Sequence, residues 1–292
     1  MRFGGHETFA IREGWLHKGL ALLKDHPDRL YSEDASDWLG VGRNMAKSIR
    51  HWLLATELAC YPDERKGGDR NPQISELGRI IWKGDKYFID PGTLWILHSN
   101  LVRSKEQAYS WYWFFNGFSV DRFEKSLCLD ALRRVLRLDK QKMPTDMTLD
   151  RDVTCLLATY ARPIPFQPRD PEEAQECPFA ELGLLTHHTT SGYYELNRRG
   201  KDIPPHVFAY VLATGFDATD VPLTEATHAD GSAGRIFALT AEALMELAVA
   251  CEHKLGTSAL RISGLAGERI INLDRRPRLQ WLVDYYAART DN

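Results

Sequence analysis

The sequence of 292 residues has few cysteines, and these form no recognisable pairs. The five cysteines stand at positions 60, 128, 155, 177 and 251, and no two of them make a Cys-x-x-Cys motif. An odd and widely spaced set argues against a disulfide framework and against a zinc ribbon. Reduced thiols are typical of the cytoplasm, so we expect a cytoplasmic protein.

Long apolar runs are also missing. No apolar stretch approaches the roughly 20 residues that a transmembrane helix needs, and the N-terminus from Met1 to His6 has no signal-peptide core. The composition is that of a folded protein, with 43% hydrophobic and 11% aromatic residues. We therefore expect a chain with no membrane partner, long enough for two or three domains.

Several motifs that mark enzyme classes are absent. The sequence contains no Walker A loop, no G-x-G-x-x-G, no G-x-S-x-G and no HNH motif. The formal net charge is -3, so the chain as a whole is not a basic nucleic-acid binder. A surface for nucleic acid would have to be a local patch of positive charge.

Such a patch is predicted between Trp38 and Thr56, where no acidic residue occurs. A short helix at 33–39, capped by Ser32, is followed by the turn Gly40-Val41-Gly42 and by a second helix. In the second helix, apolar residues from Met45 to Leu53 have the spacing of one buried face. The opposite face carries the candidate DNA-binding residues Arg43, Asn44, Lys47, Ser48 and Arg50, together with His51. The pattern predicts a helix-turn-helix, because these side chains suit phosphate and base-edge contacts; an ordinary helical hairpin with a solvated basic face is the alternative.

The residues after this helix favour DNA binding. Two short strands, at 58–61 and 73–74, flank a loop that contains Gly67-Gly68. The loop carries the further candidate DNA-binding residues Arg65, Lys66 and Arg70. Three helices followed by a charged hairpin predict a winged helix, whose wing contacts the phosphate backbone.

The rest of the chain is predicted to be mostly helical. The aromatic run from Tyr109 to Phe115 could stack on bases, but an all-round aromatic helix is more often a buried core element. Polar and proline-broken residues from Asp139 to Asp152 indicate a domain boundary, and a helix is predicted at 153–160. The C-terminal part is expected to be mixed, with strands at 192–198, 235–238 and 268–273 and helices at 205–212, 241–254 and 277–287.

These patterns predict an α+β fold, mostly α. We expect a winged-helix DNA-binding domain at 1–90, a helical region at 91–142 and a C-terminal mixed α/β domain at 143–292. His6 beside Glu7 suggests a metal site, but a structural histidine is favoured because adjacent side chains of an extended segment point to opposite sides. The adjacent His187 and His188 do not make the His-x-His pattern of a tyrosine-dependent nickase.

Short motifs resemble those of a bacterial family of unknown function. They are Phe3-Gly4-Gly5-His6-Glu7-Thr8-Phe9, Gly42-Arg43-Asn44-Met45, Ser75-Glu76-Leu77-Gly78 and Pro91-Gly92-Thr93-Leu94-Trp95. Members of that family accompany genes for DNA phosphorothioate modification and antiphage defence. The resemblance implies Mg²⁺-dependent DNA nicking, and partner subunits that include a cysteine desulfurase, an ATPase and an ATP-pyrophosphatase. It assigns no catalytic residues.

Carboxylates that cluster in the sequence are the candidates for holding Mg²⁺, which prefers one or two carboxylates plus water. We select Asp150 and Asp152 as metal ligands; their alternative role is to favour the start of a helix through its macrodipole. Asp146, the hinge residues Glu172, Glu173 and Glu176, and the wing residues Asp63 and Glu64 are weaker candidates.

We therefore expect a DNA-binding, DNA-nicking subunit of a phosphorothioation and phage-defence system that acts on double-stranded DNA. The alternative is a non-enzymatic adaptor or transcriptional regulator that recruits the modification enzymes to DNA. A homodimer is retained as a candidate assembly.

Overall fold

The computed structural model describes residues 1–62, 71–139, 143–165, 177–265 and 267–290. The chain divides into two compact units, which are described separately. Unit 1 comprises residues 1–114 and 118–196, and unit 2 comprises residues 115–117 and 197–292. The fold is mostly helical with three small sheets, as the α+β prediction requires. No helix in the described part of the chain is long and apolar enough to cross a membrane.

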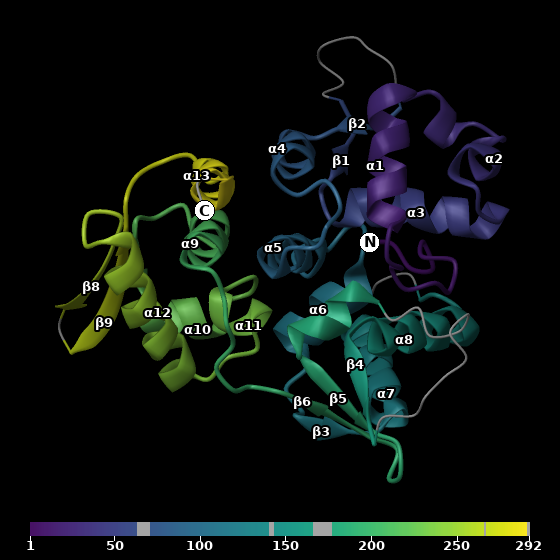
Figure 1. Cartoon of the computed structure of the whole chain (residues 1–292). Helices are drawn as coiled ribbons and strands as arrows, with labels where there is room; N and C mark the ends of the chain where they lie inside the picture. The colour runs from purple at the N-terminus through teal and green to yellow at the C-terminus, as the bar shows by residue number, and fades with distance from the viewer. Residues whose placement is uncertain (63–70, 140–142, 166–176, 266, 291–292) are drawn as a thin grey trace. The chain divides into compact units, whose positions relative to one another are not determined.

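Unit 1 begins with a cluster of helices and a short hairpin (Figure 1). Its elements are α1 (Trp15–Asp25), the 3₁₀ helix η1 (Arg29–Tyr31), α2 (Ala35–Leu39), α3 (Arg43–Ala55), β1 (Ala59–Cys60), β2 (Gln73–Ile74) and α4 (Glu76–Gly84). Gly40 ends α2 with φ 63°, which is the left-handed conformation predicted for this turn. β1 and β2 pair antiparallel, with Ala59 opposite Ile74. The predicted cap at Ser32 is wrong: Asp34 precedes α2, and the Ser32 hydroxyl hydrogen-bonds the Asp34 carboxylate.

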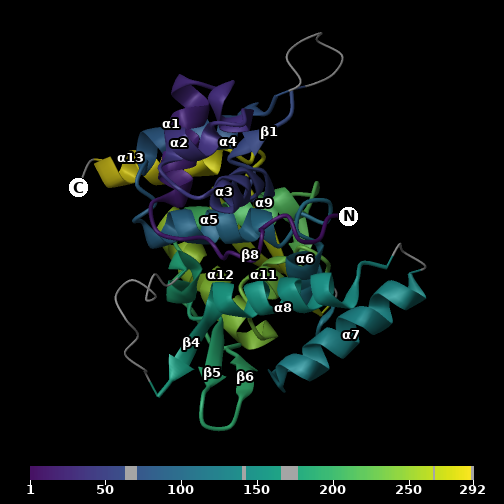
Figure 2. The same cartoon turned by 90° about the vertical axis from the view of Figure 1, so that its right-hand side faces the viewer.

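The remainder of unit 1 packs long helices beside a four-stranded sheet. It contains α5 (Pro91–Leu101), α6 (Tyr109–Gly117), whose last three residues belong to unit 2, β3 (Arg122–Phe123), α7 (Lys125–Leu138), α8 (Asp146–Tyr160), β4 (Ala161–Ile164), the 3₁₀ helix η3 (Pro178–Leu182), β5 (Leu185–His188) and β6 (Tyr193–Leu196). The strand order is β3-β6-β5-β4, with β4 parallel to β5 and the other pairs antiparallel. Figure 2 shows β4, β5 and β6 side by side.

This part of the structure tests two predictions from the sequence, the role of the aromatic helix and the start of α8. The aromatic helix α6 is core rather than a stacking surface, because Tyr109, Trp111, Trp113 and Phe114 are all buried. The start of α8 was predicted too late. The helix begins at Asp146, where the Thr145 hydroxyl accepts a hydrogen bond from the Thr148 amide.

The predicted domain boundaries after residues 90 and 142 both fall inside unit 1. Contacts between distant segments explain why this part of the chain is continuous. β3 pairs with β6 across about 70 residues of sequence, and His6 near the N-terminus contacts Asp152 on α8. The local composition of the sequence does not predict such long-range contacts.

Unit 2 is a helical cluster beside a three-stranded antiparallel sheet. It contains α9 (Pro205–Gly215), β7 (Asp220–Pro222), α10 (Leu223–His228), α11 (Ala233–Ile236), α12 (Ala241–Leu255), β8 (Leu260–Leu265), β9 (Glu268–Leu273) and α13 (Gln280–Thr290). The sheet order is β7-β9-β8, and α9 packs against both α12 and α13. The Gly231 amide donates to the side-chain oxygen of Asn116 at 2.6 Å, which ties residues 115–117 to this unit.

The strand predicted at 235–238 is wrong, because this segment forms the end of α11 and the turn after it. The Ser232 hydroxyl accepts a hydrogen bond from the Arg235 amide and caps the helix. A short apolar run does not distinguish a strand from a buried helical turn by periodicity alone.

Candidate nucleic-acid interface

The predicted DNA-facing helix, α3, exposes only its N-terminal half. Arg43, Asn44 and Lys47 are exposed, whereas Ile49, Trp52 and Leu53 are completely buried. The helix is buried on all sides from His51 to Ala55. The surface that α3 offers to a ligand is therefore its first turn and a half, next to the positive end of the helix macrodipole.

Two residues assigned to the polar face of α3 do not lie on the surface. Ser48 is fully buried, and its hydroxyl donates to the Phe9 carbonyl at 3.4 Å. The indole of Trp52 donates to the same carbonyl at 3.1 Å. The assignment of Ser48 to DNA binding is therefore corrected, because the N-terminal segment covers this side of α3. His51 is also buried.

The cationic side chains of α3 differ in their exposure and in their contacts. The Lys47 side chain is 54% exposed, and its ammonium group lies 3.9 Å from the Glu7 carboxylate, which is a weak surface contact. The Arg50 guanidinium lies 5.8 Å from the ring centroid of Tyr31 and is half-buried. Arg43 and Lys47 are therefore better placed than Arg50 to meet phosphate. Arg65, Lys66 and Arg70 lie outside the described residues.

Behind α3 lies a buried polar cluster that the sequence patterns did not indicate. The His6 ring nitrogen Nε2 is 2.9 Å from Asp152 Oδ1, which also accepts a hydrogen bond from the Gly4 amide at 2.8 Å. Asp152 Oδ2 accepts from the Ser110 hydroxyl at 2.8 Å. His6, Ser110 and Asp152 are each at most 2% exposed. His6 therefore has a structural role, as favoured from the sequence, because the cluster joins the N-terminal segment to α6 and α8.

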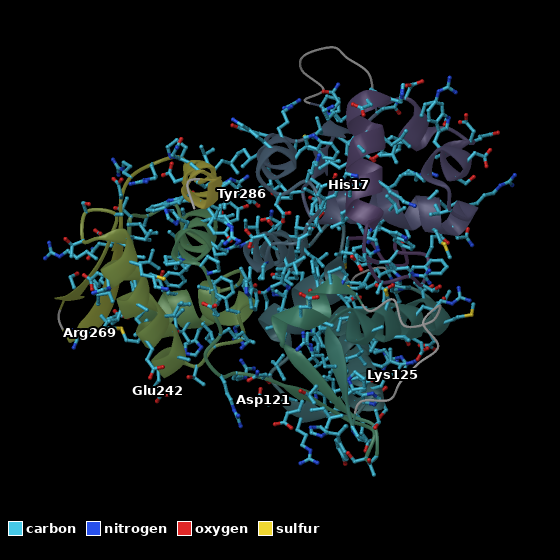
Figure 3. All side chains as sticks on the ribbon, viewed as in Figure 1. His17, Asp121, Lys125, Glu242, Arg269 and Tyr286 are labelled. Carbon is cyan, nitrogen blue, oxygen red and sulfur yellow. The ribbon has the colours of Figure 1, made fainter. Side chains whose placement is uncertain are left out.

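The two predicted metal ligands have separate environments. Asp152 is buried in the cluster, with both carboxylate oxygens engaged. Asp150 is about half exposed and forms an ion pair with Lys125, labelled in Figure 3, at 2.8 Å. Within the described ranges, no group of three or more His, Cys, Asp or Glu residues could hold a metal ion. Asp150 and Asp152 therefore have separate partners in this structure, one at the surface and one in the interior.

The other metal candidates give no described site. Asp146 accepts a hydrogen bond from the Arg133 guanidinium at 3.0 Å, so a cation already neutralises it. Asp63, Glu64, Glu172, Glu173 and Glu176 lie outside the described residues.

The buried His51 is expected to make the free energy of unfolding depend on pH. Burial, together with the smaller effects of the nearby Arg2 and His6, lowers the pKa of this imidazole to about 3. Neither ring nitrogen has a hydrogen-bond partner in the described part of the chain. The folded protein therefore holds His51 neutral.

We expect the free energy of unfolding to fall as the pH drops below about 6.5, because only the unfolded chain then protonates this histidine. The loss attributable to His51 is about 1.4 kcal/mol per pH unit, and it stops near pH 3. Urea denaturation of wild-type and His51→Leu proteins between pH 7.5 and 4.5 measures this contribution. Equal pH slopes in the two proteins would contradict it.

Comparisons with known proteins add a family and a fold. A family model described as a protein of unknown function, DUF4007, matches residues 3–286. The chain is also similar to a solved structure of SspB, with 25% sequence identity, a TM-score of 0.83, and coverage of 99% of this chain and 88% of that one. A magnesium ion-bound SspB structure matches with 24% identity, a TM-score of 0.84 and the same coverage. No curated protein matches. Because the family model spans nearly the whole sequence, the chain belongs to the DUF4007 family of proteins of unknown function.

Proposed function

We propose that this protein is a DNA-binding, Mg²⁺-dependent DNA-nicking subunit of a phosphorothioate DNA-modification and phage-defence system. The observation that carries the proposal is the full-length similarity to SspB structures. The sequence motifs at residues 3–9, 42–45, 75–78 and 91–95 independently resemble the family associated with such systems. The magnesium ion bound by one SspB structure supports the choice of metal.

The DNA-binding part of the proposal rests on the residues of α3. Together with α1, α2 and the β1–β2 hairpin, we interpret this region as a winged helix that presents Arg43, Asn44 and Lys47 to double-stranded DNA. In helix-turn-helix proteins the N-terminal residues of the recognition helix contact base edges, and only this part of α3 is exposed. Arg65, Lys66 and Arg70 on the wing are proposed to add phosphate contacts without sequence preference.

Nicking itself and its metal ligands rest on resemblance. Asp150 and Asp152 stay the predicted ligands to be tested, although each has its own partners. We propose a cysteine desulfurase, an ATPase and an ATP-pyrophosphatase as partner subunits, and a homodimer as a candidate assembly. The second candidate function is a non-enzymatic adaptor or regulator, which the same exposed basic residues would serve.

An Arg43→Ala, Lys47→Ala double variant is expected to bind duplex DNA with a shallower dependence on salt. Each phosphate contact that is lost reduces the slope of log K against log [salt] by roughly 0.9, so the slope should fall by about two units if both residues meet phosphate. Fluorescence anisotropy with a labelled duplex, at KCl concentrations from about 50 to about 300 mM, measures this slope.

Lys254→Ala is the matched control, since Lys254 is an exposed lysine on α12 of unit 2. This variant should keep the wild-type slope. A wild-type slope in the double variant would show that α3 is not the DNA-binding helix.

A further inference from the structure

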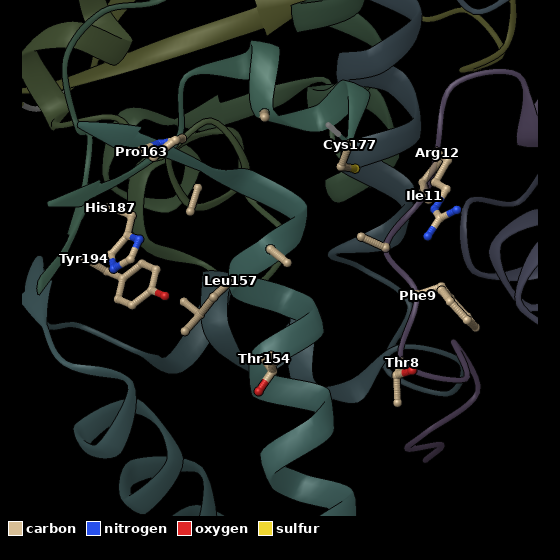
Figure 4. A pocket seen from close by; sticks show the side chains of 14 residues that line it. Thr8, Phe9, Ile11, Arg12, Thr154, Leu157, Pro163, Cys177, His187 and Tyr194 are labelled. Carbon is tan, nitrogen blue, oxygen red and sulfur yellow. The ribbon is translucent and has the colours of Figure 1, made fainter. Parts of the chain in front are cut away.

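Unit 1 contains a pocket of about 360 Å³ that lies apart from the exposed face of α3. Its walls come from the N-terminal segment at residues 8–12, from α8, from Cys177 and the 3₁₀ helix η3, and from the strands β4, β5 and β6. Figure 4 shows Arg12 at one end, the pair His187 and Tyr194 at the other, and Thr154 and Leu157 between them. The volume lies within the range of small-molecule sites.

Arg12 is the charged side chain among the described residues that line this pocket. Its guanidinium lies 5.5 Å from the ring centroid of Phe9 and 5.4 Å from that of Trp15, so two aromatic rings fix its position. The described residues that line the pocket include no Asp or Glu, and Arg12 has no ion pair with any described carboxylate. A held guanidinium with no ion pair to a described carboxylate favours an anion, and its planar fork matches phosphate.

The far wall of the pocket is aromatic. His187 on β5 and Tyr194 on β6 are directly opposite in the strand register, and their rings stack with centroids 4.3 Å apart and an 8° angle between planes. Tyr194 also stacks on Phe123, at 5.9 Å and 19°. Strand pairing and stacking on both sides make this wall rigid. Both faces of the Tyr194 ring are therefore covered, and Figure 4 shows its hydroxyl directed toward Leu157. A rigid aromatic edge that carries a hydroxyl suits the edge of a nucleobase.

Polar groups between the two ends are few but well placed. The Thr154 hydroxyl donates to the Asp150 carbonyl at 2.7 Å, which leaves its oxygen able to accept a hydrogen bond. Burial raises the pKa of the Tyr194 hydroxyl, which therefore stays protonated and can donate. These groups match the sugar and base edges of a nucleotide better than a purely apolar ligand.

We propose that this pocket binds a nucleoside monophosphate, with its phosphate at Arg12 and its base against the His187–Tyr194 wall. The ligand can come from two sources, a free mononucleotide or a nucleotide extruded from bound DNA. The second source rests on the proposed function, since it requires DNA on this protein. The first does not, so binding of mononucleotides is measured without any nicking activity.

The first test is isothermal titration of the full chain with the four deoxynucleoside 5′-monophosphates and with deoxyadenosine. We expect saturable binding of at least one monophosphate, and at least about tenfold weaker binding of the nucleoside without phosphate. Arg12→Gln should reduce monophosphate affinity by about tenfold or more. Arg122→Gln is the matched control, because Arg122 lies similarly over an aromatic ring, 5.1 Å from that of Tyr193, outside the pocket; it should leave the affinity unchanged.

A second variant tests the pocket without removing charge. Ala158 on α8 lines the pocket and is exposed, so Ala158→Phe should fill the pocket and abolish monophosphate binding in a folded protein. Ala250→Phe, at an exposed position of α12, is its control. Affinity unchanged in both Arg12→Gln and Ala158→Phe would overturn the proposal, because the nucleotide would then bind elsewhere.

The two sources are separated with a duplex that carries one unpaired 2-aminopurine. A rise in its fluorescence on binding wild-type protein, lost in Ala158→Phe, identifies an extruded nucleotide as the ligand. Monophosphate binding without that rise identifies a free nucleotide. If neither the monophosphates nor the unpaired base binds, the proposal is wrong, whatever the outcome of a nicking assay.

Discussion

Replacing Asp152 with alanine is expected to lower the free energy of unfolding by about 3–5 kcal/mol. The carboxylate accepts hydrogen bonds from the Gly4 amide and the Ser110 hydroxyl and contacts the His6 ring, all at 2.8–2.9 Å; the contacts with Ser110 and His6 are buried and the one with Gly4 is partly buried. Alanine would leave these groups without a partner in the protein interior, and each such group costs about 1–3 kcal/mol. The measurement is urea or thermal denaturation of the full chain.

Two further variants make this result specific. Asp152→Asn should cost less, about 1–2 kcal/mol, because the amide oxygen keeps two acceptor bonds and the Ser110 hydroxyl can turn to accept from the amide nitrogen. Asp150→Ala, only two residues away, should change stability by less than about 1 kcal/mol, since its ion pair with Lys125 is exposed. Equal losses in Asp150→Ala and Asp152→Ala would contradict the role given to the buried cluster.

An asparagine variant at position 150 tests the metal prediction. If Asp150 and Asp152 hold Mg²⁺, Asp150→Asn should abolish nicking while its duplex binding and melting temperature stay those of the wild type. If the surface ion pair is the whole role of Asp150, this variant nicks plasmid at the wild-type rate. Asp152→Asn does not separate the two roles, because its effect on the buried cluster would itself reduce activity.

The Ile49→Asp variant is expected not to fold in the region of α3. Ile49 is completely buried on the packed face of the helix, and an aspartate there would be an unpaired charge in an apolar environment. We expect a loss of at least about 4 kcal/mol, seen as loss of the cooperative unfolding transition and of duplex binding. The experiment combines circular dichroism with a binding measurement.

Ile89→Asp is the control, because Ile89 is 74% exposed and receives the same chemical change. This variant should melt at the wild-type temperature. A stable, DNA-binding Ile49→Asp protein would mean that the packed and exposed faces of α3 had been assigned the wrong way round.

Local patterns in the sequence predict the elements whose signals are local. The spacing of apolar residues predicts helices α2 and α3, and the positive φ that glycine can adopt predicts the turn at Gly40. β9, the central strand of its sheet, has the predicted bounds, Glu268–Leu273, because its run of apolar residues follows a glycine turn. Five aromatic residues of α6 are buried, as expected for a core helix: Tyr109, Trp111, Trp113, Phe114 and Phe115.

Contacts between distant segments account for what the sequence patterns missed. Ser48 has the helical position of a surface residue, but the carbonyl of Phe9, 39 residues earlier, covers it. His6 and Asp152 are 146 residues apart, so no spacing rule relates them. One signal was present: Ser110 stands alone as a polar residue at the start of an aromatic run, and a buried hydroxyl needs a partner. The pocket around Arg12 likewise depends on segments that are far apart in the sequence.

Relaxation of supercoiled plasmid by the purified protein, with and without Mg²⁺, tests the proposed function most directly. The proposal predicts an open-circular product that forms only with Mg²⁺, and slower nicking by the Arg43→Ala, Lys47→Ala variant than by Lys254→Ala at limiting protein concentration. EDTA should stop the reaction without releasing the duplex. Tight duplex binding with no open-circular product at any Mg²⁺ concentration would contradict nicking and identify the protein as a DNA-binding adaptor.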